Sequence, residues 1–368
     1  MLNEKQIKEI CSVFQIEGEY LRFEVITSGH INRTYKVCYF RHGEEKEYIL
    51  QRLNTYVFRN PVAVMENVTA VTKFIRAKIK ATWVSAKRSV LHYQSTADGV
   101  QYYETDDGGF WRCCRFIEGS TSFLLPENCK IVEASGKAFG EFQTYLQDFP
   151  VQQLNIVIPH FHNTVNRYKI FREALENDAA GRKDSVQEEI DGYLQLEEIA
   201  TRLYRMQRAG ELPLRVTHND TKCSNVLFDT ETLDYLCVID LDTVMPGLVA
   251  FDFGDALRIV ASKGEEDERD LTKAVLDVEK YEAFTRGFVG KAKDHLTERE
   301  QKTLALGAIA MTAECGMRFL TDYLDGDKYF RIHYPEQNLV RARCHLALAN
   351  DMIAHLDEMQ AIVDKYCQ

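Results

Sequence analysis

Apolar residues alternate with polar ones along much of the first third of the chain. Residues 22–40 and 47–53 show this alternation, which predicts strands because successive side chains of a strand point to opposite faces. Shorter apolar runs predict further strands at residues 89–93, 100–104 and 110–117. The first part of the chain is therefore expected to form a sheet.

Helical spacing of the apolar residues dominates the remainder. From about residue 129 onward, and twice before it, apolar residues recur every three or four positions, which predicts amphipathic helices. The first of these helices would follow Asn3 as its cap and carry Ile7, Ile10, Val13 and Phe14. The other predicted helices cover residues 62–80, 131–149, 165–177, 190–209, 272–289 and 304–324. A strand-rich part followed by a helix-rich part indicates an α+β fold with two lobes.

The boundary between the lobes is expected just after the last predicted strand. That strand leads out to Glu118 and Gly119, so we place a hinge near residues 113–119. The smaller β-rich lobe would comprise residues 1–117 and the larger helical lobe residues 118–368. A chain of this length can bury two hydrophobic cores.

Composition narrows the range of partners and leaves the fold open. The net charge of -11 argues against nucleic acid or an anionic membrane, both of which need a basic surface. The ten cysteines include no C-x-x-C pair, so neither a zinc site nor a disulfide framework is indicated, and reduced thiols favour a cytoplasmic location. The N-terminal residues lack an apolar signal core, and no eighteen apolar residues run together. The oligomeric state stays open.

The candidate chemistry is concentrated in residues 216–245. His218, Asp220 and Asn225 follow the spacing H-x-D-x-x-x-x-N of kinase catalytic loops. Asp220 is the candidate base for a substrate hydroxyl, and Asn225 is a candidate ligand of the Mg²⁺ that screens nucleotide phosphates. Lys222 is close enough in sequence to stabilise the phosphoryl group during transfer.

Two aspartates compete for the second metal position. Residues 226–228 and 235–239 predict a hairpin, and its second strand ends at Asp240. Asp252 begins a D-F-G tripeptide. It lies twelve residues after Asp240, and a proline and a glycine stand between the two aspartates. We interpret Asp252 as a structural carboxylate or a helix cap and predict that Asp240 binds the metal.

The nucleotide contacts are less clear from the sequence. The chain contains no Walker A sequence and no G-x-G-x-x-G loop. The third strand, which carries a lysine in protein kinases, offers Gln51 and Arg52, and strand alternation directs one of these two side chains into the cleft. At the hinge, backbone groups of Arg115, Phe116 and Ile117 are expected to contact adenine. ATP and Mg²⁺ are therefore the predicted cofactors.

A further group of polar residues lies near an apolar run in the last third of the chain. Glu314, Arg318, Asp322 and Tyr329 could form either a buried ion-pair network or a ligand site, and composition alone favours the network. We interpret His162 as a loop histidine and not as a ligand.

The order of these motifs resembles that of the aminoglycoside phosphotransferase-like kinases, which include choline and homoserine kinases. Longer blocks are similar to the bacterial N-acetylhexosamine 1-kinases, among them GHIN, YILQ, RVTHNDTK, IDLDT, FDFGD and ECGMRFL. This resemblance covers residues 30–341. It implies a protein-kinase-like fold and transfer of the γ-phosphoryl group of ATP to the anomeric hydroxyl of N-acetylglucosamine or N-acetylgalactosamine. The implied roles are base for Asp220, Mg²⁺ ligands for Asn225 and Asp240, and sugar contacts for His30, Arg318 and Tyr329.

Several alternatives remain at this point. Another kinase of the same fold, for choline, homoserine or an aminoglycoside, would keep Asp220, Asn225 and Asp240 and change only the acceptor pocket. A cationic acceptor needs an acidic or aromatic cage, whereas Arg318 suits a sugar with hydroxyl and carbonyl groups. The missing A-P-E motif disfavours a protein kinase. The alternative from a different class is a nucleotide-binding protein without catalysis.

Overall fold

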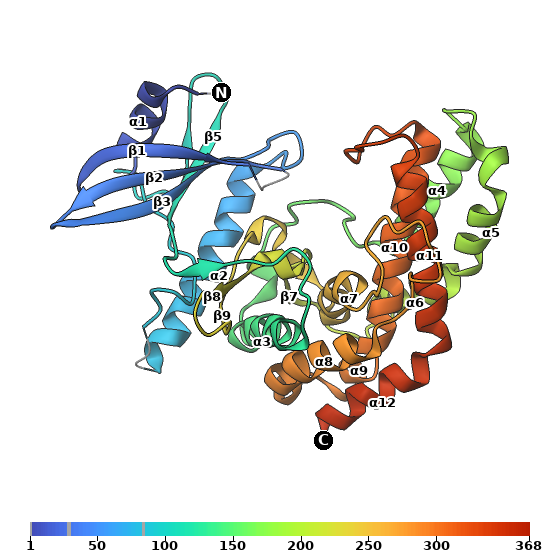
Figure 1. The fold of residues 1–368 in the computed structure, drawn as a ribbon. Coiled ribbons are helices and arrows are strands. Elements are labelled where there is room, and N and C mark those ends of the chain that lie inside the picture. Colours follow the sequence, from blue (N-terminus) through green and yellow to red (C-terminus); the bar gives the residue numbers. More distant parts are fainter. Residues whose placement is uncertain (1, 28–30, 83–84) are drawn as a thin grey trace.

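The computed structural model describes residues 2–27, 31–82 and 85–368 (Figure 1). A small part that carries the long strands lies beside a larger part made mainly of helices. This confirms the α+β class predicted from the sequence. The chain passes from one part to the other between β5 (Phe110–Arg115) and β6 (Ser120–Thr121).

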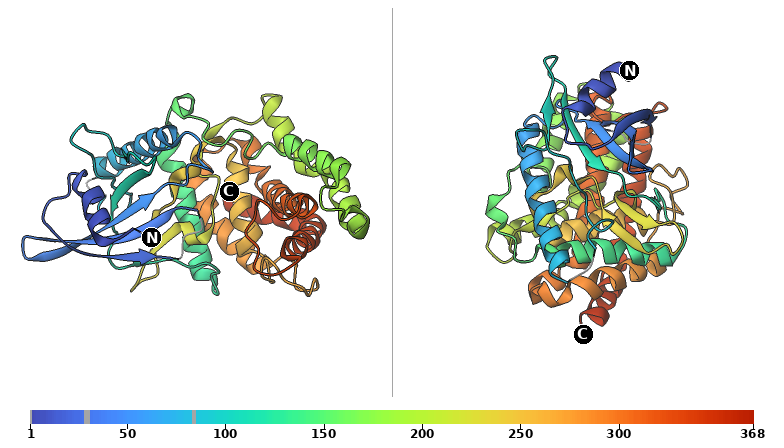
Figure 2. Two further views of the ribbon diagram at one scale, coloured as in Figure 1. Left: turned by 90° about the horizontal axis from the view of Figure 1, so that it is seen from above. Right: turned by 90° about the vertical axis from the view of Figure 1, so that its left-hand side faces the viewer.

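The small part is built on an antiparallel five-stranded sheet. The strands are ordered β1 (Glu19–Ile26), β2 (Arg33–Arg41), β3 (Glu44–Arg52), β5 and β4 (Tyr103–Glu104). One face of the sheet packs on α1 (Glu4–Ser12), and the other faces α2 (Pro61–Ala81), which runs beside the sheet in both views of Figure 2. Asn3 begins α1 by accepting a hydrogen bond from the backbone N–H of Gln6.

Three of the predicted elements are absent, shortened or interrupted in the structure. The predicted strand at residues 89–93 is wrong, because these residues form a turn and only Tyr93 makes an isolated bridge, to Cys114. The strand predicted at residues 100–104 is reduced to β4. The helix predicted at residues 190–209 is interrupted at Leu196. Short apolar runs report which side chains are buried, and burial does not require a strand ladder or an unbroken helix.

The larger part is a helical assembly. Its α-helices are α3 (Cys129–Leu146), α4 (Thr164–Asn177), α5 (Gln187–Gln195), α6 (Glu197–Arg208), α7 (Val249–Val260), α8 (Val278–Ala292), α9 (Glu298–Gln301), α10 (Leu304–Asp325), α11 (Gln337–Ala354) and α12 (Leu356–Cys367). Short 3-10 helices lie at Val151–Gln153, Lys183–Val186, Cys223–Asn225, Leu241–Thr243 and Lys293–His295. The helix predicted from residue 272 begins instead at Val278, where Asp277 caps it.

Helices α3 and α8 pack with their backbones in close approach. A Cβ atom added at Gly136 of α3 would lie 2.3 Å from the carbonyl oxygen of Phe284 in α8. The small residues of α3 therefore permit a contact that a larger side chain would prevent.

Helix α10 is the central helix of the larger part. Its length and composition would allow it to cross a membrane, but 89% of its most apolar stretch is buried inside the protein. It packs against α7 on one side and α11 on the other. Its apolar character is thus explained by the core that surrounds it.

Candidate active site

Two short strand pairs hold the loop that carries the candidate base. Strand β7 (Arg215–Thr217) pairs with β10 (Met245–Gly247), and β8 (Val226–Asp229) pairs with β9 (Tyr235–Val238). This confirms the hairpin predicted before Asp240. The backbone N–H of Ile239 donates to the carbonyl oxygen of Asn225 over 2.8 Å, so Asp240 begins directly beside the end of the loop.

The loop brings Asp220, Lys222 and Asn225 together. Lys222 Nζ lies 3.1 Å from Asp220 Oδ2, and Asn225 Nδ2 donates to the same oxygen over 3.0 Å. Burial alone would lower the pKa of Lys222, but the Asp220 carboxylate raises it above its ordinary value. Lys222 therefore stays protonated beside Asp220.

His218 links the loop to the end of β9. Its Nε2 lies 2.9 Å from the carbonyl oxygen of Ile239, and its Nδ1 accepts a hydrogen bond from the backbone N–H of Asp220 over 3.2 Å. These partners assign the proton of the neutral ring to Nε2. The imidazole joins the backbone N–H of Asp220 to the carbonyl oxygen of Ile239, the residue before Asp240.

Asp240 occupies a position suited to a metal ligand. Its backbone is left-handed, with φ of 59°, which is uncommon for a residue other than glycine. Its carboxyl group reaches solvent at the cleft. Partial desolvation of the carboxyl group by the atoms packed around it, followed by repulsion from Asp242 and Asp220, raises the pKa of Asp240 to about 6. A divalent cation would relieve this repulsion.

The donor atoms here fit Mg²⁺, which prefers carboxylate and amide oxygens. Asn225 donates through Nδ2 to both the carbonyl oxygen and the carboxylate of Asp220. Within the described part of the chain, Asn225 Oδ1 has no hydrogen-bond donor and is available to a metal together with the carboxylate of Asp240.

Asp252 has a structural role. Its Oδ2 accepts hydrogen bonds from His218 N (2.8 Å) and Gln143 Nε2 (3.0 Å), and its Oδ1 accepts one from Asn219 N (2.8 Å). The side chain is buried, and burial raises the pKa of Asp252 to about 6. Both oxygens hold the catalytic loop, which agrees with the interpretation of Asp252 as a structural carboxylate.

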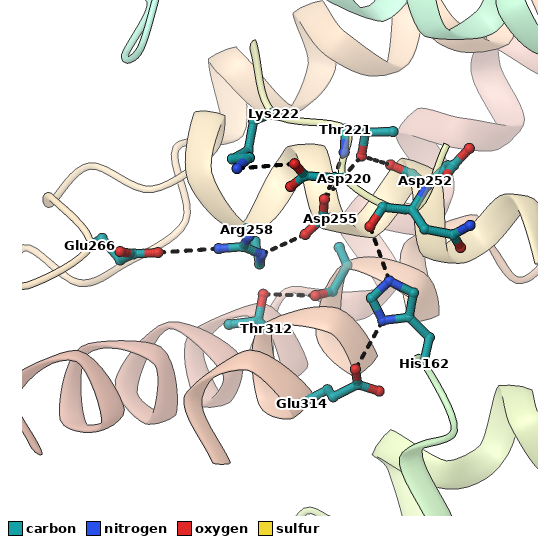
Figure 3. A network of polar contacts seen from close by, with 12 residues as sticks. His162, Asp220, Thr221, Lys222, Asp252, Asp255, Arg258, Glu266, Thr312 and Glu314 are labelled. Carbon is teal, nitrogen blue, oxygen red and sulfur yellow. Dashed lines mark hydrogen bonds and ion pairs between the residues drawn. The ribbon is translucent and has the colours of Figure 1, made fainter. Parts of the chain in front are cut away.

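A second group of polar contacts supports the loop from the helical part (Figure 3). The backbone N–H of Thr221 donates to Asp255 over 2.8 Å. On the other side, His162 bridges the carbonyl oxygen of Asn219 (3.2 Å) and the carboxylate of Glu314 (2.9 Å). The sequence interpretation of His162 as a simple loop histidine missed this bridge, because its partners lie far away along the chain.

The structure separates the two candidate residues of the third strand. Gln51 faces the cleft, where its Oε1 accepts a hydrogen bond from Arg112 Nε over 3.0 Å. Arg52 lies on the opposite face of the sheet, with its guanidinium 5.9 Å from the centre of the Trp111 ring. Arg52 is therefore not brought to the catalytic loop. Sequence reasoning also missed Arg112, which forms a buried ion pair with Asp242.

The hinge residues line a pocket of about 390 Å³. Arg115, Phe116 and Ile117 form part of its wall, together with residues of β3 and of the turn after β8. The N–H of Arg115 already donates to His92 O and that of Phe116 to Glu47 O. Of these three residues, Ile117 is the one whose N–H has no acceptor among the described residues, so this N–H is available to a ligand.

The polar residues predicted in the last third of the chain, Arg318 and Asp322 among them, lie near the segment of Phe161 and His162. The guanidinium of Arg318 lies 5.7, 5.9 and 5.4 Å from the ring centres of Phe161, Tyr329 and Phe330. Asp322 holds this segment by accepting hydrogen bonds from the backbone N–H groups of Lys328, Tyr329 and Phe330. Phe161 precedes His162, so Arg318 is linked through few contacts to the loop of Asp220. His30 lies outside the described residues.

Comparisons with known proteins agree with this geometry. The model of the phosphotransferase enzyme family matches residues 22–284. Among solved structures, a microcompartment-associated aminopropanol kinase is 13% identical, with a TM-score of 0.61 over 97% of this chain and 99% of that one. Choline kinase from Cryptosporidium parvum is 14% identical, with a TM-score of 0.56 over 99% of each chain. An ADP-bound aminoglycoside phosphotransferase is 12% identical, with a TM-score of 0.51 over 95% of this chain and 99% of that one.

These similarities establish the kinase-like α+β fold that the sequence predicted. The matched region contains the predicted hinge, the loop of Asp220, the hairpin and Asp240. On this evidence, the chain belongs to the phosphotransferase enzyme family.

Proposed function

We propose that this protein transfers the γ-phosphoryl group of ATP to the anomeric hydroxyl of N-acetylglucosamine or N-acetylgalactosamine. Residues 1–117 would bind the nucleotide, and residues 118–368 would supply the catalytic loop and the acceptor site. The ADP bound to one structural neighbour supports ATP as the donor. The choice of acceptor is supported by the positive charge of Arg318.

The proposed reaction begins with the acceptor hydroxyl at Asp220. The carboxylate of Asp220 accepts the proton of the hydroxyl, while Lys222 and Asn225 keep Oδ2 in a fixed position. Lys222 balances negative charge on the phosphoryl group during transfer. Mg²⁺, held by Asn225 and Asp240, would screen the phosphates of the nucleotide.

The nucleotide would lie between the sheet and the hairpin. Gln51 faces this space, and the free N–H of Ile117 would contact adenine at the hinge. The proposal assigns no phosphate contact to Arg52, because its side chain lies on the other face of the sheet. Arg115 and Phe116 would contribute through groups other than their bonded N–H.

The observation that carries the choice of acceptor is the position of Arg318 among three aromatic rings. These rings could otherwise form a cage for an ammonium group. With a guanidinium already over them, a second cation about 5 Å away would be repelled by roughly 3 kcal/mol at an effective dielectric constant of about 20. A neutral sugar avoids this repulsion, and its acetamido carbonyl could accept a hydrogen bond from Arg318. Tyr329 and His30 would complete the contacts to the sugar.

The acidic groups that border Arg318 hold parts of the protein in place, although Glu314 Oε2, which is buried, has no hydrogen-bond partner among the described residues. Glu314 bonds to His162, and Asp322 collects backbone N–H groups. Although burial raises the pKa of Glu314, the nearby His162, Arg167 and Arg318 bring it below its ordinary value. These carboxylates are therefore poorly placed to pair with an amine.

The test is ADP release with ATP and Mg²⁺ across N-acetylglucosamine, N-acetylgalactosamine, choline, homoserine and an aminoglycoside. Phosphorus NMR of the product identifies the phosphorylated position. A sugar 1-phosphate supports the proposal. Turnover of an amine alone would reject the acceptor and keep the catalytic residues. ATP binding without turnover of any acceptor would favour the non-catalytic alternative.

A further inference from the structure

A buried ion pair joins the small lobe to the turn that follows the candidate metal ligand. Arg112 on β5 donates to Asp242 with both Nη atoms, and the Nη2 to Oδ2 distance is 3.0 Å. The two side chains are 2% and 3% exposed. Charges buried to this degree persist in a protein only when they are paired.

The position of Arg112 in the sheet compensates for the missing lysine of the third strand. Gln51 and Arg112 are direct cross-strand partners in the β3–β5 pairing. Side chains in such positions share the same face and begin about 5 Å apart. The guanidinium of Arg112 therefore lies in the space that a lysine at position 51 would reach.

The acidic partner of Arg112 does not come from the helix that supplies it in protein kinases. In protein kinases, the lysine of the third strand pairs with a glutamate of the following helix. Here that helix is α2, and its exposed Glu66 bonds instead to Asn155. The α2 residue that touches Arg112 is Met65, whose sulfur lies 3.8 Å from Nη1. The carboxylate is supplied by Asp242, so the ion pair crosses between the lobes.

Asp242 lies in a turn whose shape decides where Asp240 points. The 3-10 helix Leu241–Thr243 starts directly after Asp240, whose backbone is left-handed. Such a conformation costs free energy in a residue other than glycine and persists only when its surroundings hold it. Two side chains of the small lobe hold this turn through Asp242, namely Arg112 and Asn32, the latter over 2.8 Å.

We propose that Arg112 is a positioning residue, which anchors Asp242 to the small lobe and thereby keeps Asp240 in its metal-binding conformation. The fifth strand thus supplies the cation that the third strand lacks. This inference rests on the proposed function in one respect, namely that Asp240 binds the metal of the nucleotide. It does not depend on the identity of the acceptor.

The test measures metal binding and needs no acceptor. Mn²⁺ replaces Mg²⁺ as a probe that electron paramagnetic resonance detects, and its affinity is measured in the presence of ATP. The affinity for ATP without metal is measured separately. The first variant, R112M/D242N, removes both charges at once, so no unpaired charge is left in the interior and the fold is retained.

Two more variants make the test specific. In R112M/Q51K the cation returns to the third strand, where the lysine can reach Asp242. In the matched control R52M, a positive charge is removed from the neighbouring residue on the other face of β3.

We expect R112M/D242N to bind Mn²⁺ about 10- to 100-fold more weakly, which is typical when a group that orients a metal ligand is lost. Its affinity for metal-free ATP should not change. R112M/Q51K should recover most of the Mn²⁺ affinity, and R52M should match the unmodified protein.

Unchanged Mn²⁺ affinity in R112M/D242N would overturn the proposal. So would R112M/Q51K binding Mn²⁺ as weakly as R112M/D242N, because the location of the cation would then be irrelevant. If the unmodified protein binds no Mn²⁺ with ATP, the proposed function fails as well. Normal Mn²⁺ binding without turnover of any sugar rejects the acceptor alone and leaves the role of Arg112 in place.

Discussion

Replacing Asp240 with asparagine should stabilise the metal-free protein and abolish its activity. The shift of its pKa from 3.8 to about 6 arises from withdrawal from water and from repulsion by Asp242 and Asp220. At 1.36 kcal/mol per pKa unit this shift corresponds to roughly 3 kcal/mol. Because Asp240 is exposed to solvent, screening reduces its contribution to about 1 kcal/mol.

The sign of this effect depends on pH. A carboxyl group whose pKa is raised in the folded state favours folding at low pH and loses that contribution as the pH rises through about 6. D240N should therefore raise the unfolding temperature by roughly 1–2 °C at about pH 7.5, given an unfolding entropy of about 2 cal/mol/K per residue. The gain should shrink as the pH falls from about 6 and vanish at about pH 2.5, where the carboxyl group is protonated in both states.

The assay is calorimetric unfolding without metal at both pH values, combined with ADP release in the presence of Mg²⁺. Activity should fall roughly 100-fold or more, because a metal stabilises the transition state by several kcal/mol. A lower unfolding temperature for D240N at about pH 7.5 would refute the argument that the carboxylates repel one another.

Asp252→Asn is the matched comparison. The amide would present N–H groups toward the two donors that now reach Oδ2, from His218 and Gln143. Loss of these two charge-assisted hydrogen bonds should cost roughly 3–6 kcal/mol. The unfolding temperature should then fall by about 4–8 °C. If D252N instead removed metal binding without lowering stability, Asp252 would be the metal ligand.

Three further predictions follow from individual contacts. Asp220→Asn should lower kcat by about 10²–10⁴-fold in ADP release, with ATP binding nearly unchanged in calorimetry, and near-normal kcat would exclude Asp220 as the base. Arg318→Met should raise the KM for the sugar about tenfold or more, because a charge-assisted hydrogen bond is worth roughly 1.5–3 kcal/mol, and an unchanged KM would remove Arg318 from the sugar site. Gly136→Ala should lower the unfolding temperature, because its Cβ would lie 2.3 Å from Phe284 O, whereas the control Gly290→Ala meets no atom within 4 Å and should raise it.

Much of the candidate site could be predicted because its residues are close in sequence. Asp220, Lys222 and Asn225 belong to one loop, and the hairpin that leads to Asp240 follows at once. Local turns and short strands fix the distances between such residues almost independently of the rest of the fold. The interpretation of Asp252 was reached in the same way, from its distance beyond the hairpin.

Contacts between distant segments could not be predicted in this way. The alternating pattern of β3 could not show whether Gln51 or Arg52 points into the cleft. The face of the sheet that covers the cleft depends on which helices pack on each side. Similarly, His162 and Glu314 are 152 residues apart, and nothing in the local sequence of either indicates the other.

The sequence by itself thus determined the α+β class and the hairpin before Asp240, and it predicted the loop that carries the candidate base, since periodicity and short spacings express local geometry. The tertiary structure alone decided that Arg112 pairs with Asp242. Residues 130 positions apart form this pair, and it requires the sheet of the small part to lie against the turn after Asp240. Such pairings depend on the packing of whole elements, which local spacing does not encode.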